Sequence, residues 1–134
     1  MAIRLIRLFT GGDGQSHFDV DEVEWNKTDA GGAMSSSEAA RTVSFEETAA
    51  GSSLDWHNAQ HRRQHAITLG GRLEFETRAG KRQIVESGDF LLAEDASGGG
   101  HRWRLIDDQP WRCVYVALWR SALQPVSISA LCSC

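Results

Sequence analysis

The chain has 134 residues, with 14 Lys and Arg against 18 Asp and Glu, and a formal net charge of −4. This length suits one domain, which can bury roughly two-thirds of the surface that its unfolded chain exposes. A net acidic charge argues against a nucleic-acid-binding protein, because such proteins concentrate Lys and Arg. We also expect no membrane span, because no run reaches the roughly 20 apolar residues that cross a bilayer.

The N-terminal stretch and the cysteines indicate the compartment. Arg4 and Arg7 interrupt the apolar residues that an export signal would need. Cys113 lies in an apolar run and Cys132 and Cys134 lie at the end of the chain, unlike the even framework of a secreted disulfide protein. We therefore expect a cytoplasmic protein. The terminal Cys-x-Cys could bind a soft metal or form a redox bond, but the absence of neighbouring ligands favours a frayed terminus.

Short alternating runs of β-branched and aromatic residues, separated by Gly, Asp and Ser, predict an all-β sandwich or barrel. In the first half, the predicted strands cover 3–9, 18–23, 42–47 and 54–57. The small residues over 29–40 predict a loop, with a short helix over 36–41 as an alternative. In the second half, turn residues separate predicted strands over 63–69, 72–78, 82–85, 90–93, 101–106 and 112–119.

Two stretches resemble the sequence motifs of the cupin family. The residues from His57 to Glu76 resemble the first motif, in which two histidines and a glutamate precede a strand that ends in a glycine turn. His57 stands in the place of the first histidine, and Gln64, seven residues before Gly71, in that of the glutamate. The second motif, a Gly-Asp turn, a strand, a loop and a histidine, resembles the residues from Gly88 to His101.

The resemblance implies an antiparallel double-stranded β-helix, or jelly-roll barrel, over about half the chain. It implies one cupin domain over 1–134, with a barrel core at about 42–119, an N-terminal strand extension and a C-terminal tail. It also implies a divalent metal, Fe, Ni, Zn, Mn or Cu, held by His57, Gln64 and His101. Ala59 stands in the place of the second histidine, and a neutral amide replaces the glutamate, so we expect weaker metal binding than four ligands provide.

Strand alternation predicts which side chains share the barrel interior. Gln64, Ala66 and Thr68 share one face of their strand, and His65 lies on the other; His101 shares its face with Trp103. We therefore expect an apolar pocket with a few convergent polar groups. The predicted catalytic residues are His57, His101 and Glu94, and the predicted substrate-binding residues are Gln64, Arg62, Thr68 and Trp103.

The loop before His101 leaves two alternatives open. Glu94 and Asp95 could supply a third metal ligand or a general acid or base. They could equally form a solvated turn, and a solvated turn is slightly more expected for Asp95 than for Glu94. His61 and His65 are expected on the face opposite to Gln64, where a surface position is more common than ligation.

These features predict a small cupin enzyme that acts on a small organic substrate, with dioxygenase, isomerase or lyase chemistry at a metal held by two histidines. One alternative is a metal-free lyase, isomerase or cyclase that uses histidine as general base. Another is a cupin that only binds a small ligand, since a fold does not define an activity. We also predict a homodimer, because the alternating run over 3–9 would leave an exposed strand edge unless it pairs.

Overall fold

The computed structural model describes residues 2–59 and 63–119. These residues form strands and no helix, so no helix long and apolar enough to cross a membrane occurs among them. The strands are β1 (Arg4–Thr10), β2 (Ser16–Glu22), β3 (Lys27–Asp29), β4 (Gly32–Met34), β5 (Ala40–Thr48), β6 (Ser53–His57), β7 (Gln64–Gly70), β8 (Arg72–Thr77), β9 (Arg82–Glu86), β10 (Phe90–Ala93), β11 (His101–Leu105) and β12 (Trp111–Leu118).

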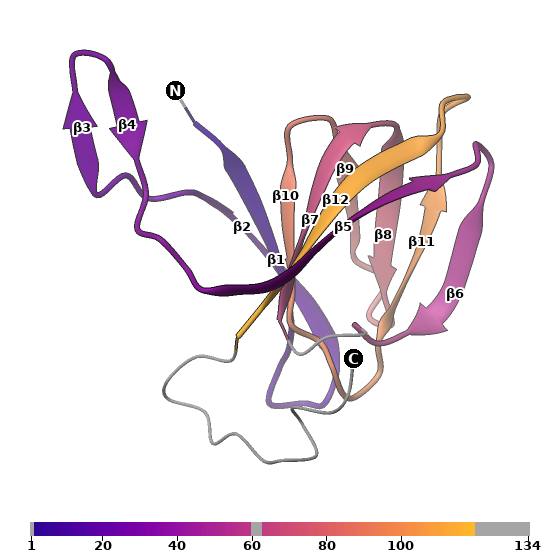
Figure 1. Ribbon diagram of the computed structural model, residues 1–134. Helices are drawn as coiled ribbons and strands as arrows, with labels where there is room; N and C mark the ends of the chain where they lie inside the picture. Colours follow the sequence, from indigo (N-terminus) through magenta and orange to yellow (C-terminus); the bar gives the residue numbers. More distant parts are fainter. Residues whose placement is uncertain (1, 60–62, 120–134) are drawn as a thin grey trace.

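Two sheets contain all of these strands except the small β3–β4 hairpin (Figure 1). The large sheet has the order β2-β1-β10-β7-β12-β5, and the small sheet has the order β6-β11-β8-β9. From β5 onward the antiparallel pairs are nested: β5 pairs with β12, β6 with β11, β7 with β10, and β8 with β9. Nested pairing shared between two sheets is the double-stranded β-helix, so the predicted jelly roll is confirmed.

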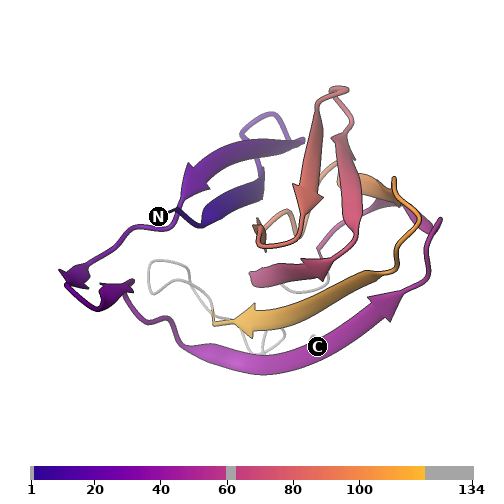
Figure 2. The same ribbon diagram turned by 90° about the horizontal axis from the view of Figure 1, so that it is seen from above.

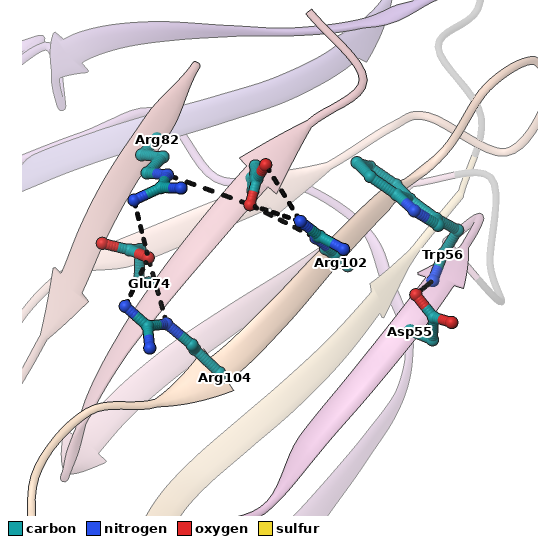
Figure 3. Close-up of polar contacts among 7 residues, drawn as sticks. Asp55, Trp56, Glu74, Arg82, Arg102 and Arg104 are labelled. Carbon is teal, nitrogen blue, oxygen red and sulfur yellow. Dashed lines mark hydrogen bonds and ion pairs between the residues drawn. The ribbon is translucent and has the colours of Figure 1, made fainter. Parts of the chain in front are cut away.

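The core lies between the two sheets, and strand alternation places it there. Leu73 and Phe75 of β8 point inward and are buried, together with Ile6, Leu8 and Val85. The alternate residues of β8 point outward and form ion pairs with neighbouring strands. Figure 3 shows Glu74 of β8 between Arg82 of β9 and Arg104 of β11. The outer face of the small sheet is therefore a charged surface.

The N-terminal segment is part of the large sheet. β1 pairs in parallel with β10 on one side and antiparallel with β2 on the other. The run over 3–9 therefore pairs within the chain and leaves no exposed edge, because the edges of the large sheet are β2 and β5. The predicted homodimer cannot rest on that run.

The segment between β2 and β5 also differs from the prediction. The stretch expected as a loop contains the β3–β4 hairpin, in which Lys27 pairs with Met34 and Asp29 with Gly32. No helix forms over 36–41, since β5 begins at Ala40. Every residue of this hairpin is exposed, so its strands carry none of the alternation of buried and exposed residues by which strands are recognised in a sequence.

Candidate functional site

A cavity of about 240 Å³ lies between the two sheets and is lined by residues of both. Its larger apolar and aromatic lining residues are Leu54, Phe75, Leu91, Trp103, Trp111 and Tyr115, and three alanines complete the apolar lining: Ala59, Ala93 and Ala117. Its polar lining includes His57 of β6, Gln64 of β7 and His101 of β11. The structure thus brings to one cavity the three residues at which the two sequence motifs were expected to meet.

Strand pairing and a close loop contact hold the two histidines together. His101 is the register partner of His57, and the centroids of their rings are 4.4 Å apart. Gly100, with φ of +75°, precedes His101, and a Cβ at this position would come within 2.5 Å of the carbonyl oxygen of His57. The loop backbone therefore packs directly on the backbone of His57, which the absence of a side chain at Gly100 permits.

Asp95 lies behind His101 and is fully buried. Its Oδ2 is 2.6 Å from Nδ1 of His101 and accepts a 2.6 Å hydrogen bond from Oγ of Ser16 in β2. Its Oδ1 is also buried and has no hydrogen-bond partner among the described residues. Because an ionised carboxylate only accepts, Nδ1 of His101 donates to it, and Nε2 of the neutral ring is left as an acceptor.

His57 is oriented in a similar way. Its Nδ1 is 2.7 Å from the backbone oxygen of Asp55, which can only accept, so the ring donates through Nδ1. Burial lowers the pKa of His57, and the neighbouring His101 lowers it further. Both rings therefore present an Nε2 that has no hydrogen-bond partner in the described part of the chain.

The sequence analysis left Asp95 open between a metal ligand or general acid or base and a solvated turn, and it did not include Asp95 among the predicted catalytic residues. Its partner Ser16 lies 79 residues away in the sequence, so no local pattern connects the two. The one available signal was position, because Asp95 stands in the loop that leads to His101, six residues before it. The backbone oxygen of Asp95 also accepts hydrogen bonds from Asn58 and Ala59, which tie this loop to the end of β6.

Two of the predicted site residues lie elsewhere. Glu94 does not line the cavity: its carboxylate accepts from Arg7 at 2.7 Å and from Arg63 at 3.3 Å. Thr68 is buried but does not line the cavity either; its hydroxyl accepts a 3.2 Å hydrogen bond from the indole of Trp111, which does. Arginines of neighbouring segments thus hold the carboxylate of Glu94, and the indole of Trp111 lies over the hydroxyl of Thr68.

The other predicted residues are placed as follows. Trp103 lines the cavity, and its ring centroid is 5.3 Å from that of Trp111. His65 lies outside the cavity, with its ring at the edge of Phe90. Arg62, His61, Cys132 and Cys134 lie outside the described residues.

The donor set does not fit the metal site that the resemblance implies. Within residues 2–59 and 63–119 no group of three His, Cys, Asp or Glu side chains could hold a metal ion. His57, His101 and Gln64 offer two imidazoles and an amide, and Ala59 lines the cavity without a donor. Asp95 is directed to Nδ1 of His101, on the opposite edge of the ring from Nε2.

No family model and no curated protein matches the chain. Among solved structures, it is similar to a DUF861 family protein from Thermotoga maritima (26% identity, 57% of this chain and 77% of that chain, TM-score 0.45). It is also similar to a Cupin 2 conserved barrel domain protein from Salinispora arenicola (25%, 60% and 63%, 0.47) and to a cupin protein from Bacteroides fragilis (17%, 78% and 92%, 0.45).

The strand pairing from β5 to β12 and the two motifs define the class of the protein. It is a small cupin-type jelly roll that carries a cavity between its sheets. Many unrelated functions use this kind of fold, so the activity has to be argued from the cavity.

Proposed function

We propose that the cavity binds a small neutral organic molecule with a flat apolar part, and that His101 removes a proton from it without a metal, in isomerase or lyase chemistry. The observation that carries this proposal is the chain of hydrogen bonds from Ser16 through Asp95 to His101. A buried carboxylate behind an imidazole orients the ring, and it stabilises the positive charge that forms when Nε2 accepts a proton.

His57 has a complementary role in this proposal. Its pKa is lowered by burial, so the ring stays neutral and its Nε2 accepts a hydrogen bond from a hydroxyl group of the ligand. The His101 ring is 4.4 Å away, and a charge there lowers the pKa of His57 further. This division of roles makes His101 the base and His57 an orienting group.

The lining of the cavity supports a neutral, partly aromatic ligand. Four aromatic rings line it, from Phe75, Trp103, Trp111 and Tyr115. Among the described residues that line the cavity, Glu46 is the one acidic side chain, and none is Lys or Arg. An anionic ligand would therefore meet no compensating charge, whereas the amide of Gln64 can donate to or accept from a carbonyl or hydroxyl group.

Solvent-deuterium exchange tests the proposal. Phenylacetone, a neutral aryl ketone with an acidic carbon next to its carbonyl, serves as the probe, and exchange at that carbon is followed by NMR. We expect the protein to accelerate exchange, and Asp95→Asn to reduce this acceleration by about 100-fold while binding of the probe is retained. The control Glu94→Gln, next to Asp95 but outside the cavity, should leave exchange unchanged.

The outcomes separate the alternatives. Exchange that survives Asp95→Asn unchanged would contradict the role of His101 and Asp95. Exchange that is lost on chelation and restored by a divalent metal would favour the metal-dependent enzyme. The observation that supports this alternative is that Nε2 of His57 and Nε2 of His101 have no hydrogen-bond partner among the described residues. Binding of the probe without exchange would favour a cupin that only binds a ligand.

A further inference from the structure

Strand β5 is an exposed edge of the large sheet. It has nine residues, pairs with β12 on one side, and is the outermost strand of the sheet (Figure 2). Seven of its nine residues are exposed, including Val43 at 57% and Phe45 at 78%. A long edge strand with exposed apolar side chains is a template for pairing with another chain.

Of the other three edges of the two sheets, β2 and β9 carry charges in the places where β5 is apolar, and β6 exposes Leu54 beside Asp55. In β2 the exposed residues include Asp19, Asp21 and Glu22. In β9, at the edge of the small sheet, Arg82 and Glu86 are exposed. Arg82 reaches Glu74, as Figure 3 shows, and also Glu76. Charges on an edge strand oppose pairing with another chain. The centre of β5, by contrast, is Val43-Ser44-Phe45, with neither a charge nor a proline.

The sequence of β5 is complementary to itself in one antiparallel register. With a two-fold axis through Ser44, Val43 of one copy lies opposite Phe45 of the other, and Arg41 lies opposite Glu47. Opposed residues in an antiparallel pair project to the same face and interact most strongly when they are apolar or of opposite charge. This register therefore makes two apolar pairs and two ion pairs.

Neighbouring registers lack this match. An axis through Val43 places Arg41 opposite Phe45, and an axis through Phe45 places Val43 opposite Glu47. A register shifted by one residue places the cavity face of one copy beside the outer face of the other. The side chains thus select one arrangement among those that the backbone allows.

We infer that two copies of the chain pair through β5 in this register and form one continuous sheet across a two-fold axis. Thr42, Ser44 and Glu46 of β5 line the cavity, so the interface borders the cavities of both copies. The sequence analysis expected the run over 3–9 to form the dimer interface, and in this inference β5 forms it. This inference does not depend on the proposed chemistry.

Light scattering and sedimentation of the full chain at tens of micromolar test the dimer. We expect a dimer, and we expect Phe45→Lys to yield a folded monomer with the far-UV spectrum of the wild type, because this side chain is exposed in the single chain. The matched control is Val20→Lys, at the opposite edge of the same sheet and 51% exposed, which should remain dimeric. A wild-type monomer, or a dimer that Phe45→Lys leaves intact, would overturn the inference.

Charge exchange and cross-linking test the register. Arg41→Glu and Glu47→Arg should each weaken the dimer by about 10-fold. The double variant should recover part of this loss, because it rebuilds both ion pairs between the copies with the signs exchanged but leaves Arg112 without its partner Glu47. In a background with Cys132 and Cys134 replaced by Ser, Ser44→Cys should form a disulfide between copies under mild oxidation, and Thr42→Cys should not. A dimer in which the outer faces of two sheets pack together would leave Ser44→Cys unlinked and would refute the register.

Discussion

At the scale of single residues, Gly100 sets the spacing between the two histidine rings. Its φ of +75° suits glycine, and a Cβ would lie 2.5 Å from the oxygen and 2.9 Å from the carbon of the His57 carbonyl group. Both neighbouring atoms belong to the backbone of a paired strand, so they cannot move aside as a flexible side chain would. The pairing of His57 with His101 therefore depends on a glycine at this position.

We predict that Gly100→Ala destabilises the protein more than a glycine substitution that is strained by φ alone. Gly80→Ala is the matched control, since Gly80 has φ of +84° but open space around its Cβ position. In the control, the free energy of unfolding should fall by about 1–2 kcal/mol, the cost of a left-handed conformation for alanine. In Gly100→Ala it should fall by about 1–3 kcal/mol more, because the added Cβ meets the backbone of His57. Urea unfolding of both variants measures the difference, and equal losses would show that the close approach to His57 costs nothing.

The partial burial of His57 and His65 predicts how stability depends on pH. Burial lowers the pKa of both His57 and His65 below the usual 6.5 of the unfolded chain. Just below that value the unfolded chain binds more protons than the folded protein, so the free energy of unfolding falls as the pH drops. Urea unfolding at roughly pH 7.5 and roughly pH 5.5 should show this loss, and His65→Gln should make it smaller. A loss of the same size in the variant would assign the effect to other groups.

Glu94 and Asp95 show what the sequence could predict of the site and what it could not. The resemblance to the two cupin motifs pointed to His57, Gln64 and His101, and these three residues line one cavity. Glu94 and Asp95 stand at the end of a strand, where alternation stops. Their positions depend on Arg7, Arg63 and Ser16, which approach from other segments of the chain.

At the scale of elements, one ion pair fastens β1 to the turn that precedes β10. Nε and Nη2 of Arg4 bind the two carboxylate oxygens of Asp89 at 3.0 and 2.6 Å, and Nη2 also donates to the backbone oxygen of Ile84. Asp89 is 7% exposed and accepts from the backbone of Glu86 as well. A parallel pair such as β1 and β10 has no hairpin turn to set its register, so this contact at one end helps to define it.

We predict that Arg4→Ala lowers the free energy of unfolding by about 1–3 kcal/mol, because it leaves a buried carboxylate without its cation. The matched control is Arg72→Ala, which removes a 2.9 Å pair with Glu86 whose two side chains are each 51% exposed. An exposed pair of this kind contributes about 0–1 kcal/mol. Chemical denaturation compares the two variants, and an Arg4→Ala loss no greater than the control would show that the pair does not anchor β1.

The predicted elements were most reliable where one face of a strand is buried. β8 was predicted as a strand over 72–78 and is found at Arg72–Thr77, with its inward residues buried in alternation. β3 and β4 were missed because their residues bury neither face, and backbone pairing and a hydrogen bond from Gly31 N to Asp29 Oδ1 hold the hairpin without a core contact. The pairing of β1 was missed for another reason: its alternation indicates a buried face but does not indicate which strand lies beside it.

At the scale of the whole molecule, the N-terminal hairpin and the barrel share one core. Ile6 and Leu8 of β1 are fully buried in the same cluster as Leu73 and Phe75 of β8. Ser16, in the next strand, reaches the carboxylate that supports His101. The hairpin therefore contributes both to the core and to the cavity, and it is more than an extension attached to a finished barrel.

A shared core predicts that a substitution in the hairpin costs as much as one in the barrel. Ile6→Ala should lower the free energy of unfolding by about 2–5 kcal/mol, as Leu73→Ala should, because both side chains are fully buried. Val20→Ala, on the same face of the hairpin but 51% exposed, is the control and should cost about 1 kcal/mol or less. Both core variants should unfold in a single transition with the slope of the wild type. If β1 and β2 were an appendage, Ile6→Ala would cost little, or a separate early transition would appear while Leu73→Ala still lowered the main one.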